Sequence, residues 1–272
     1  MPDGPVGAAS TSPLPLSVVI STRNRPRQVL ATLGSLMAGQ RRPADIVVVD
    51  QSDADDPGVA AFVAGHAGIR RILTPARGLS RGRNEGMAAT RCPLVALIDD
   101  DVDAPPGWAE AMVAALRQEG PGTLVSGRVL PGAPPGDADG WVPSTKTSLA
   151  PEHHTAPTGV DVLWGNHFGL WRDAIGRVGP FDTRLGPGGP WASADDNDYG
   201  YRALRAGLAV AYRPDVTLTH VAWRSGRELY SVQWDYGRGQ GGFYAKHAHW
   251  GNPLMLRRLL RDAAHDLAGI AR

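Results

Sequence analysis

Three consecutive carboxylates, Asp99, Asp100 and Asp101, are the side chains of this 272-residue chain best suited to chemistry. They directly follow the apolar run Leu94–Ile98, which predicts a buried strand. Adjacent carboxylates repel one another, and a hard divalent cation such as Mg²⁺ or Mn²⁺ relieves that repulsion by taking oxygen ligands. Because alternate residues at a strand end point to the same side, Asp99 and Asp101 can face one ligand. The alternative is a solvated acidic turn, with Asp103 capping the next helix.

Two further segments have the composition of a nucleotide site. Asp50 ends the apolar run 46–49, where a carboxylate can accept hydrogen bonds from a base or ribose, although an ordinary turn cap is the alternative. Segment 78–86 combines glycines, a hydroxyl and two arginines, one of them Arg83, at the start of an expected helix. Such groups can hold a phosphate, or they can form a flexible basic loop. The glycine spacing matches neither a Walker A loop nor a dinucleotide fingerprint.

The second half of the chain offers a second acidic group and a histidine. Residues 195–198 open a predicted helix, where acidic side chains either favour the helix dipole or supply a general base. His220 ends an expected short strand and is either structural or a ligand. Tryptophans also gather in this region, where they could stack on sugar rings or fill the core: Trp141, Trp164, Trp171, Trp191 and Trp223.

The elements that must position these residues alternate between strand and helix in the first half. This alternation predicts crossover connections and a mostly parallel sheet, whose ligands bind at the carboxyl ends of the strands. Strands are expected at 16–20, 45–50, 69–73, 94–98 and 123–129, and helices at 26–37, 58–66, 80–90 (with Ser80 as N-cap) and 108–118. Beyond a Pro- and Gly-rich stretch at 130–158, short strands are expected at 160–164, 168–171, 209–212 and 216–220, and helices at 198–206 and from 226 onward.

Composition narrows the partners and the compartment. A net charge of +1 gives no overall field for nucleic acid, and one cysteine excludes an intrachain disulfide. No apolar run approaches the length of a transmembrane span, and residues 1–15 predict a loose tail rather than a signal peptide. A cytoplasmic location is therefore expected. The basic, leucine-rich segment 254–272 could form a homodimer helix or touch the inner membrane face.

In their order along the chain, these segments resemble the inverting family 2 glycosyltransferases over about residues 16–227. The resemblance implies an α/β GT-A fold: a Rossmann-like, mostly parallel central sheet flanked by helices, with a small acceptor-side sheet and a helical C-terminal extension. It implies a catalytic domain at 16–225, with a nucleotide-binding half at 16–129 and an acceptor-binding half at 130–225. The helical extension then occupies 226–272.

The resemblance also assigns roles to particular residues. Asp196 becomes the general base, and Asp101 with His220 holds the metal. Asp195 stands where the family more often has Glu, and Ala194 where it often has Gly. The donor-binding set is Thr22, Arg23, Asn24, Asp50, Arg83, Asp99 and Asp100. The acceptor-binding set is Trp164, Gly165, Asn166, Asp195 and Trp191.

The expected function is an inverting transfer of a sugar from a nucleotide-diphosphate sugar to an acceptor hydroxyl, assisted by Mg²⁺ or Mn²⁺. UDP or dTDP is favoured as the donor nucleotide, with guanine as the alternative base. A sugar nucleotidyltransferase would need a glycine-rich, lysine-bearing loop after the first strand, and residues 21–24 have neither feature. A non-catalytic nucleotide-sugar binding module would bind the donor without transferring or hydrolysing it.

Overall fold

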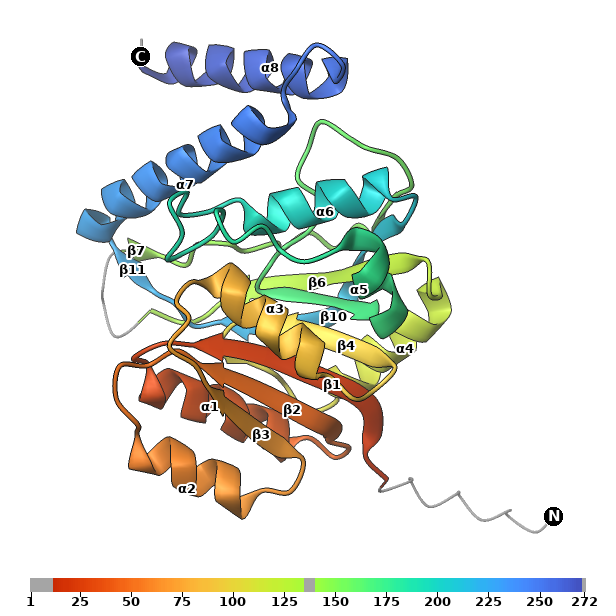
Figure 1. Ribbon diagram of the computed structural model, residues 1–272, viewed down its shortest axis with the longest axis vertical. Helices are drawn as coiled ribbons and strands as arrows, with labels where there is room; N and C mark the ends of the chain where they lie inside the picture. The colour runs from red at the N-terminus through yellow and green to blue at the C-terminus, as the bar shows by residue number, and fades with distance from the viewer. Residues whose placement is uncertain (1–11, 135–139, 271–272) are drawn as a thin grey trace, which may run out of the picture.

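A computed structural model describes residues 12–134 and 140–270, so most of the expected N-terminal tail lies outside the described residues. Its centre is one nine-stranded sheet with helices on both faces (Figure 1). The strands are β1 (Leu14–Thr22), β2 (Pro43–Asp50), β3 (Ile69–Leu73), β4 (Leu94–Ile98), β5 (Val102–Asp103), β6 (Thr123–Pro131), β8 (Glu152–His154), β9 (His167–Trp171) and β10 (Ala209–His220). The flanking helices are α1 (Pro26–Ala38), α2 (Pro57–Gly65), α3 (Leu79–Ala89), α4 (Trp108–Glu119), α5 (Arg172–Val178) and α6 (Asp195–Arg205).

The sheet is mostly parallel, with strand order β3-β2-β1-β4-β9-β6-β10-β5 and β8 paired to β10. β9 runs antiparallel to β4 and β6, and β5 and β8 run antiparallel to β10. The other strands all run the same way. Their carboxyl ends therefore meet along one edge of the sheet, which is where such sheets bind ligands.

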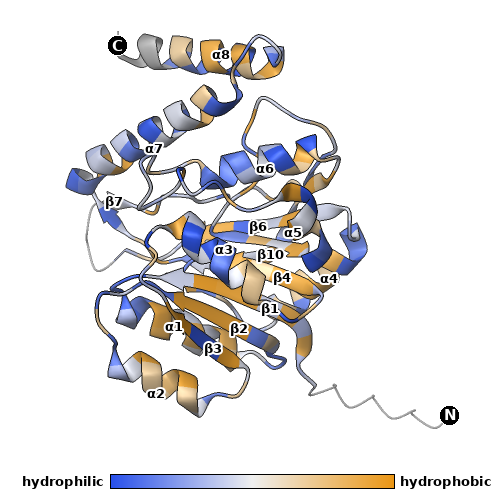
Figure 2. Ribbon diagram, viewed as in Figure 1, coloured by the Kyte–Doolittle hydropathy of each residue, from blue (hydrophilic) through white to orange (hydrophobic). Residues whose placement is uncertain are grey.

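Residues of β1 alternate between two hydrophobic cores, one on each face of the sheet. Val18 and Ile20 pack with α1, α2 and α4, whereas Val19 packs with α3, α5 and α6. This follows from the two-residue period of a strand, and helices on both faces explain why β1 is apolar throughout. Figure 2 shows the hydrophobic residues concentrated on the central strands.

Two C-terminal helices, α7 (Gly226–His247) and α8 (Pro253–Ile270), pack together over α6 (Figure 1). A third hydrophobic cluster joins them to α6 and contains Ala194, Tyr201, Phe243, Tyr244 and Met255. Ahead of α7, β11 (Arg224–Ser225) pairs with β7 (Gly140–Trp141) to form a small second sheet. No helix in the described ranges is both long and apolar enough to cross a bilayer.

Several local expectations were wrong. Residues 160–164 form no strand; Val162 and Leu163 are buried without strand pairing. The two short strands expected over 209–220 are one strand, β10, which carries a register shift between Arg213 and Thr217.

The expected helix caps and one helix start were also wrong. Ser80 lies inside α3 and donates to the carbonyl of Leu185, while Gly78 is the N-cap. Asp103 lies in β5 rather than capping α4. The range 198–206 expected for the next helix starts too late: α6 begins at Asp195, as expected from the acidic residues 195–198 at its start.

Candidate functional site

A cavity of about 440 Å³ lies beyond the carboxyl ends of β1, β4 and β10. The aspartate triplet enters it because β4 ends at Ile98, paired with Ile20 of β1. The cavity wall also includes the start of α3, the loop before β9 and the start of α6. Seven predicted donor or metal residues line it, together with the predicted base Asp196: Thr22, Arg23, Arg83, Asp99, Asp100, Asp101 and His220. So do the predicted acceptor residues Gly165, Asn166 and Asp195.

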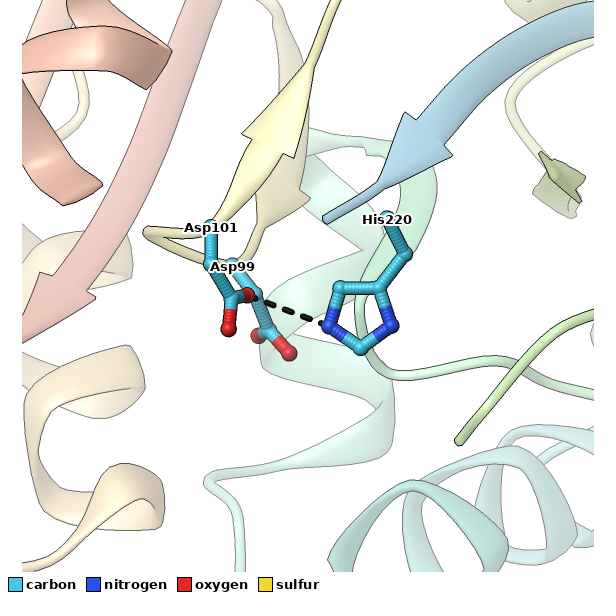
Figure 3. A group of neighbouring side chains, drawn as sticks. All are labelled: Asp99, Asp101 and His220. Carbon is cyan, nitrogen blue, oxygen red and sulfur yellow. Dashed lines mark hydrogen bonds and ion pairs between the residues drawn. The ribbon is translucent and has the colours of Figure 1, made fainter. Parts of the chain in front are cut away.

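Asp99, Asp101 and His220 form a cluster in this cavity with the donor atoms of a metal site (Figure 3). One ligand atom from each residue lies within 4.8 Å of the other two. The His220 Nε2 is 3.1 Å from the Asp101 Oδ1, and its Nδ1 is 2.9 Å from the carbonyl of Pro143. Because a carbonyl only accepts, Nδ1 carries a proton and Nε2 is the nitrogen left to bind an ion.

The two charged partners of this cluster shift each other's pKa. Burial lowers the pKa of His220, but the hydrogen bond to Asp101 and the nearby carboxylates outweigh burial, so the pKa is raised. Burial opposes ionisation of Asp101, yet hydrogen bonds and charges from His220 and Arg25 hold its pKa below the usual range. Asp101 is therefore a carboxylate, the form that binds a cation.

Arg25 is a site residue that the sequence analysis missed. Its Nη1 lies 2.6 Å from the Asp100 Oδ1, and its Nη2 lies 2.5 Å from the Asp101 Oδ2. Asp100 also accepts a hydrogen bond of 2.6 Å from Thr22. Burial raises the pKa of Asp100 to about 7 despite these partners. Asp100 thus links Thr22 to Arg25 within the cavity wall.

Arg83 joins the metal cluster to the start of α6. Its Nη1 lies 2.5 Å from the Asp195 Oδ2, and its Nη2 lies 3.0 Å from the Asp99 Oδ1 and 2.7 Å from the Gly165 carbonyl. Burial lowers the pKa of this guanidinium, but the charges of Asp195 and Asp99 outweigh burial. The pKa is therefore raised, and Arg83 stays charged. Sequence positions 112 residues apart are thereby held in one network.

Asp196 is a cavity-lining carboxyl group whose two oxygens are both held by backbone amides. Its Oδ2 accepts a 2.9 Å hydrogen bond from the Gly165 amide, and its Oδ1 accepts one of 2.9 Å from the Asn197 amide. Burial, with a further contribution from the charge of Asp195, raises the pKa of Asp196 to about 7. The carboxyl group is fixed in place and titrates near neutral pH, as a general base requires.

A second cavity, of about 520 Å³, adjoins the first and shares Asp196 with it. The predicted acceptor residue Trp164 lines this second cavity only. Five residues line both cavities, and they belong to three separate parts of the chain: Ser144; Ser193, Ala194 and Asp196; and Tyr236. Asp196 therefore stands at the junction of two compartments.

Three predicted site residues lie outside both cavities. Asp50 is buried, and its carboxylate is held by Arg71 at 2.5 Å and by the Ser52 amide at 2.9 Å. Asn24 donates to Asp53 at 2.7 Å and braces the loop after β1. Trp191 lies against α7 and borders a separate hollow near Asp182 and Lys246.

Besides Arg25, the cavity wall includes polar side chains that sequence reasoning did not select. Gln51 donates to the carbonyls of Ala76 and Gly78 and so ties the end of β2 to the start of α3. Tyr236 and Arg224 come from the segment after β10, where no motif singled them out. The position of Gln51 directly after Asp50, at a strand end, was the one available signal.

The family model of glycosyl transferase family 2 matches residues 17–175. A glucosyl-dolichyl phosphate glucuronosyltransferase of Haloferax volcanii is 27% identical over 192 residues, which cover 63% of this chain and 57% of that protein. A pre-mycofactocin glycosyltransferase of Mycobacterium tuberculosis is 25% identical over 246 residues, which cover 89% of this chain and 50% of that protein. The chain thus spans about half the length of these curated relatives.

Among solved structures, the mannosyltransferase PcManGT from Pyrobaculum calidifontis, in complex with GDP-Man and Mn²⁺, superposes with a TM-score of 0.62. The match covers 96% of this chain and 79% of that one, at 18% sequence identity. At this identity the likeness concerns the fold alone. It confirms the GT-A architecture expected from the sequence.

Proposed function

The chain belongs to glycosyl transferase family 2, and from this membership and the site geometry we propose that it is an inverting sugar transferase. Its substrates would be a nucleotide-diphosphate sugar and an acceptor hydroxyl. In this proposal residues 16–129 form the donor half, residues 130–225 the acceptor half, and residues 226–272 a helical extension.

The observation that carries the proposal is the position of Asp196 between two cavities. The first cavity contains Arg23, Arg25, Arg83 and Arg224, whose positive charges suit a diphosphate. The second contains aromatic and hydroxyl groups. A hydroxyl entering from the second cavity would reach Asp196 on its way to a sugar held in the first. Asp196 would take the hydroxyl proton as the new bond forms, and no protein nucleophile is needed, so the anomeric configuration inverts.

A divalent cation fits the donor cavity because Asp99, Asp101 and His220 offer two carboxylate oxygens and one imidazole nitrogen within 4.8 Å of one another. Oxygen and nitrogen ligands of this kind suit Mg²⁺ or Mn²⁺. When bound, such an ion supplies Lewis acidity that stabilises the departing diphosphate. The Mn²⁺ in the PcManGT structure, which shares the fold, supports the same assignment.

The preferred donor is proposed to carry a pyrimidine, as in UDP or dTDP, on the strength of Thr22 and Asp50. Since Asp50 is already held by Arg71, a base would have to exchange with that arginine to reach it. A thermal-shift panel of UDP, dTDP and GDP, with and without Mn²⁺, tests the choice. The largest Mn²⁺-dependent rise in Tm is expected with UDP or dTDP, and a larger rise with GDP would reverse the assignment.

Two substitutions separate binding from chemistry. Asp196→Asn should keep Mn²⁺-dependent donor binding while lowering transfer by about 10²- to 10⁴-fold, the usual contribution of a general base. Asp101→Ala should lose Mn²⁺-dependent donor binding itself. Equal turnover by wild type and Asp196→Asn would contradict the base assignment. Donor binding with neither hydrolysis nor transfer in the wild type would indicate a non-catalytic binding module.

A further inference from the structure

Four glycines in the second half of α7 fall into two pairs, one facing close neighbours and the other facing open space. A Cβ built on Gly239 would lie 2.6 Å from the backbone C and N of Ser193, and one on Gly242 would lie 2.6 Å from the Trp191 ring. These two glycines let α7 approach the body of the protein. In contrast, a Cβ on Gly237 or Gly241 would meet nothing within 4 Å.

Gly237 and Gly241 are one helical turn apart, and both line the second cavity. Each glycine costs a helix interior roughly 0.5–1 kcal/mol relative to alanine. Close packing does not require glycine at these two positions. The missing side chains leave open space on the α7 side of this cavity, whose lining also contains Leu163 and Trp164.

Among the described residues, the charged side chains that line this cavity are all acidic. They are Asp161, Asp196 and Asp262, and no described lysine or arginine lines it. Arg258, which is buried behind the lining, lies 2.5 Å from the Asp161 Oδ1 and 3.7 Å from the Asp262 Oδ2. Its charge is therefore already balanced. An anionic group placed here would lose its hydration without gaining a cationic partner, which is costly.

The remaining walls suit a ring that carries hydroxyl groups. Trp164, Tyr236 and Tyr244 offer aromatic faces or edges, on which the apolar face of a sugar or cyclitol ring can stack. Ser193, Asn197 and Gln240 offer hydroxyl and amide groups for hydrogen bonds. A volume of about 520 Å³ is that of an ordinary small-molecule site.

We propose that this second cavity, closed by α7 and α8, binds the acceptor, and that the acceptor is an uncharged polyhydroxylated ring compound rather than a phosphorylated or carboxylated one. The inference rests on the proposed transferase function and adds to it the acceptor class. The two cavities differ in the cationic groups that they offer. Four arginines line the first cavity beside its aspartates, whereas the charged groups that line the second cavity, among the described residues, are acidic only.

The test compares an acceptor panel with a cavity-filling variant. Methyl glucoside, methyl mannoside and myo-inositol are offered with the donor and Mn²⁺, beside their phosphate esters and a glucuronide. Transfer to the best neutral compound should exceed transfer to its phosphate ester by at least about tenfold, equivalent to about 1.4 kcal/mol. Gly241→Leu should lower that transfer by at least about tenfold by filling the cavity.

Leucine is a better helix former than glycine, so Gly241→Leu should not unfold α7. Gly176→Leu is the matched control, because Gly176 is an exposed glycine of α5 that lines neither cavity and meets nothing within 4 Å. Preference for an anionic acceptor, unchanged transfer in Gly241→Leu, or failure of every neutral compound while donor hydrolysis persists would overturn the inference. Absence of both donor hydrolysis and transfer in the wild type would instead count against the proposed function.

Discussion

Arg25 places its Nη2 2.5 Å from the Oδ2 of Asp101, the carboxylate whose other oxygen lies 3.1 Å from His220. The guanidinium thus supplies positive charge beside the predicted metal ligands. A cation that binds Asp101 competes with Arg25 for the same carboxylate. A donor diphosphate in this cavity would give Arg25 a new anionic partner, so metal and donor binding are expected to favour each other.

Arg25→Gln should therefore raise the affinity of the nucleotide-free protein for Mn²⁺. Two positive charges a few ångströms apart repel by about 1.4 kcal/mol or more at the effective dielectric of such sites. Removing the arginine charge should therefore raise the affinity for Mn²⁺ about tenfold. Affinity for UDP in the presence of Mn²⁺ should fall. Calorimetric titration measures both. Arg23→Gln is the control for the Mn²⁺ measurement, since Arg23 lines the same cavity but pairs with Asp53 at 3.5 Å. Weaker Mn²⁺ binding by Arg25→Gln would contradict the competition.

Removing Arg83 should destabilise the fold. Arg83→Met leaves Asp195 buried without its partner at 2.5 Å, and breaking a buried pair in this way costs about 3–5 kcal/mol. Asp195→Asn added to Arg83→Met should recover much of the loss, because the stranded charge is gone. Urea denaturation of the single and double variants measures the effect. A double variant as unstable as Arg83→Met would show that the loss comes from packing rather than charge.

The raised pKa of Asp196, about 7, makes both stability and activity depend on pH. In the unfolded chain an aspartate ionises near pH 4, so between about pH 4 and pH 7 the folded state binds the extra proton. Stability of the wild type should therefore fall as pH rises through this window. Asp196→Asn, which cannot ionise, should have a higher Tm than the wild type at pH 8, by about 2–4 °C for each kcal/mol gained in the free energy of unfolding. At pH 4 the two Tm values should be close.

Transfer by the wild type should rise with pH up to about 7 and then level, because Asp196 accepts a proton only when ionised. Asp103→Asn is the control for both measurements, since Asp103 is exposed and lines neither cavity. A melting temperature of Asp196→Asn below that of the wild type at pH 8 would argue that the carboxylate stabilises the fold and is not held there for chemistry.

The fold and the position of the aspartate triplet could be predicted because their signals are local in the sequence, whereas the metal roles of Asp101 and His220 were expected from the family resemblance. The aspartate triplet directly follows the apolar strand Leu94–Ile98, His220 is the last residue of β10, and parallel strands bring their carboxyl ends together. Arg25 could not be found in this way, because its partners lie 75 and 76 residues further along the chain. The neighbouring sequence does not distinguish Arg25 from Arg23, which is two residues earlier and pairs with Asp53 instead.

The wrong expectations about strands 160–164 and 209–220 and about Trp191 also arise because the deciding contacts are not visible in the local sequence. An apolar pair such as Val162 and Leu163 predicts burial, but here burial is achieved against α6 without strand pairing. A proline such as Pro214 often marks the end of a strand, yet β10 continues past it with a shift in register. The aromatic ring of Trp191 does pack, but against Gly242 of α7 rather than in the site, and composition does not indicate which neighbour a ring will meet.

Two glycines of α7 should respond oppositely to alanine. Gly239→Ala places a methyl group 2.6 Å from the Ser193 backbone, so α7 must move away from the body and stability should fall by about 1–3 kcal/mol. Gly241→Ala places its methyl group in open space and should raise stability by about 0.5–1 kcal/mol through helix propensity. Thermal denaturation of the two variants, made in the same helix two residues apart, measures the difference. Equal shifts of the same sign would mean that α7 does not rest on Ser193, and the second cavity would then lose the wall that defines it.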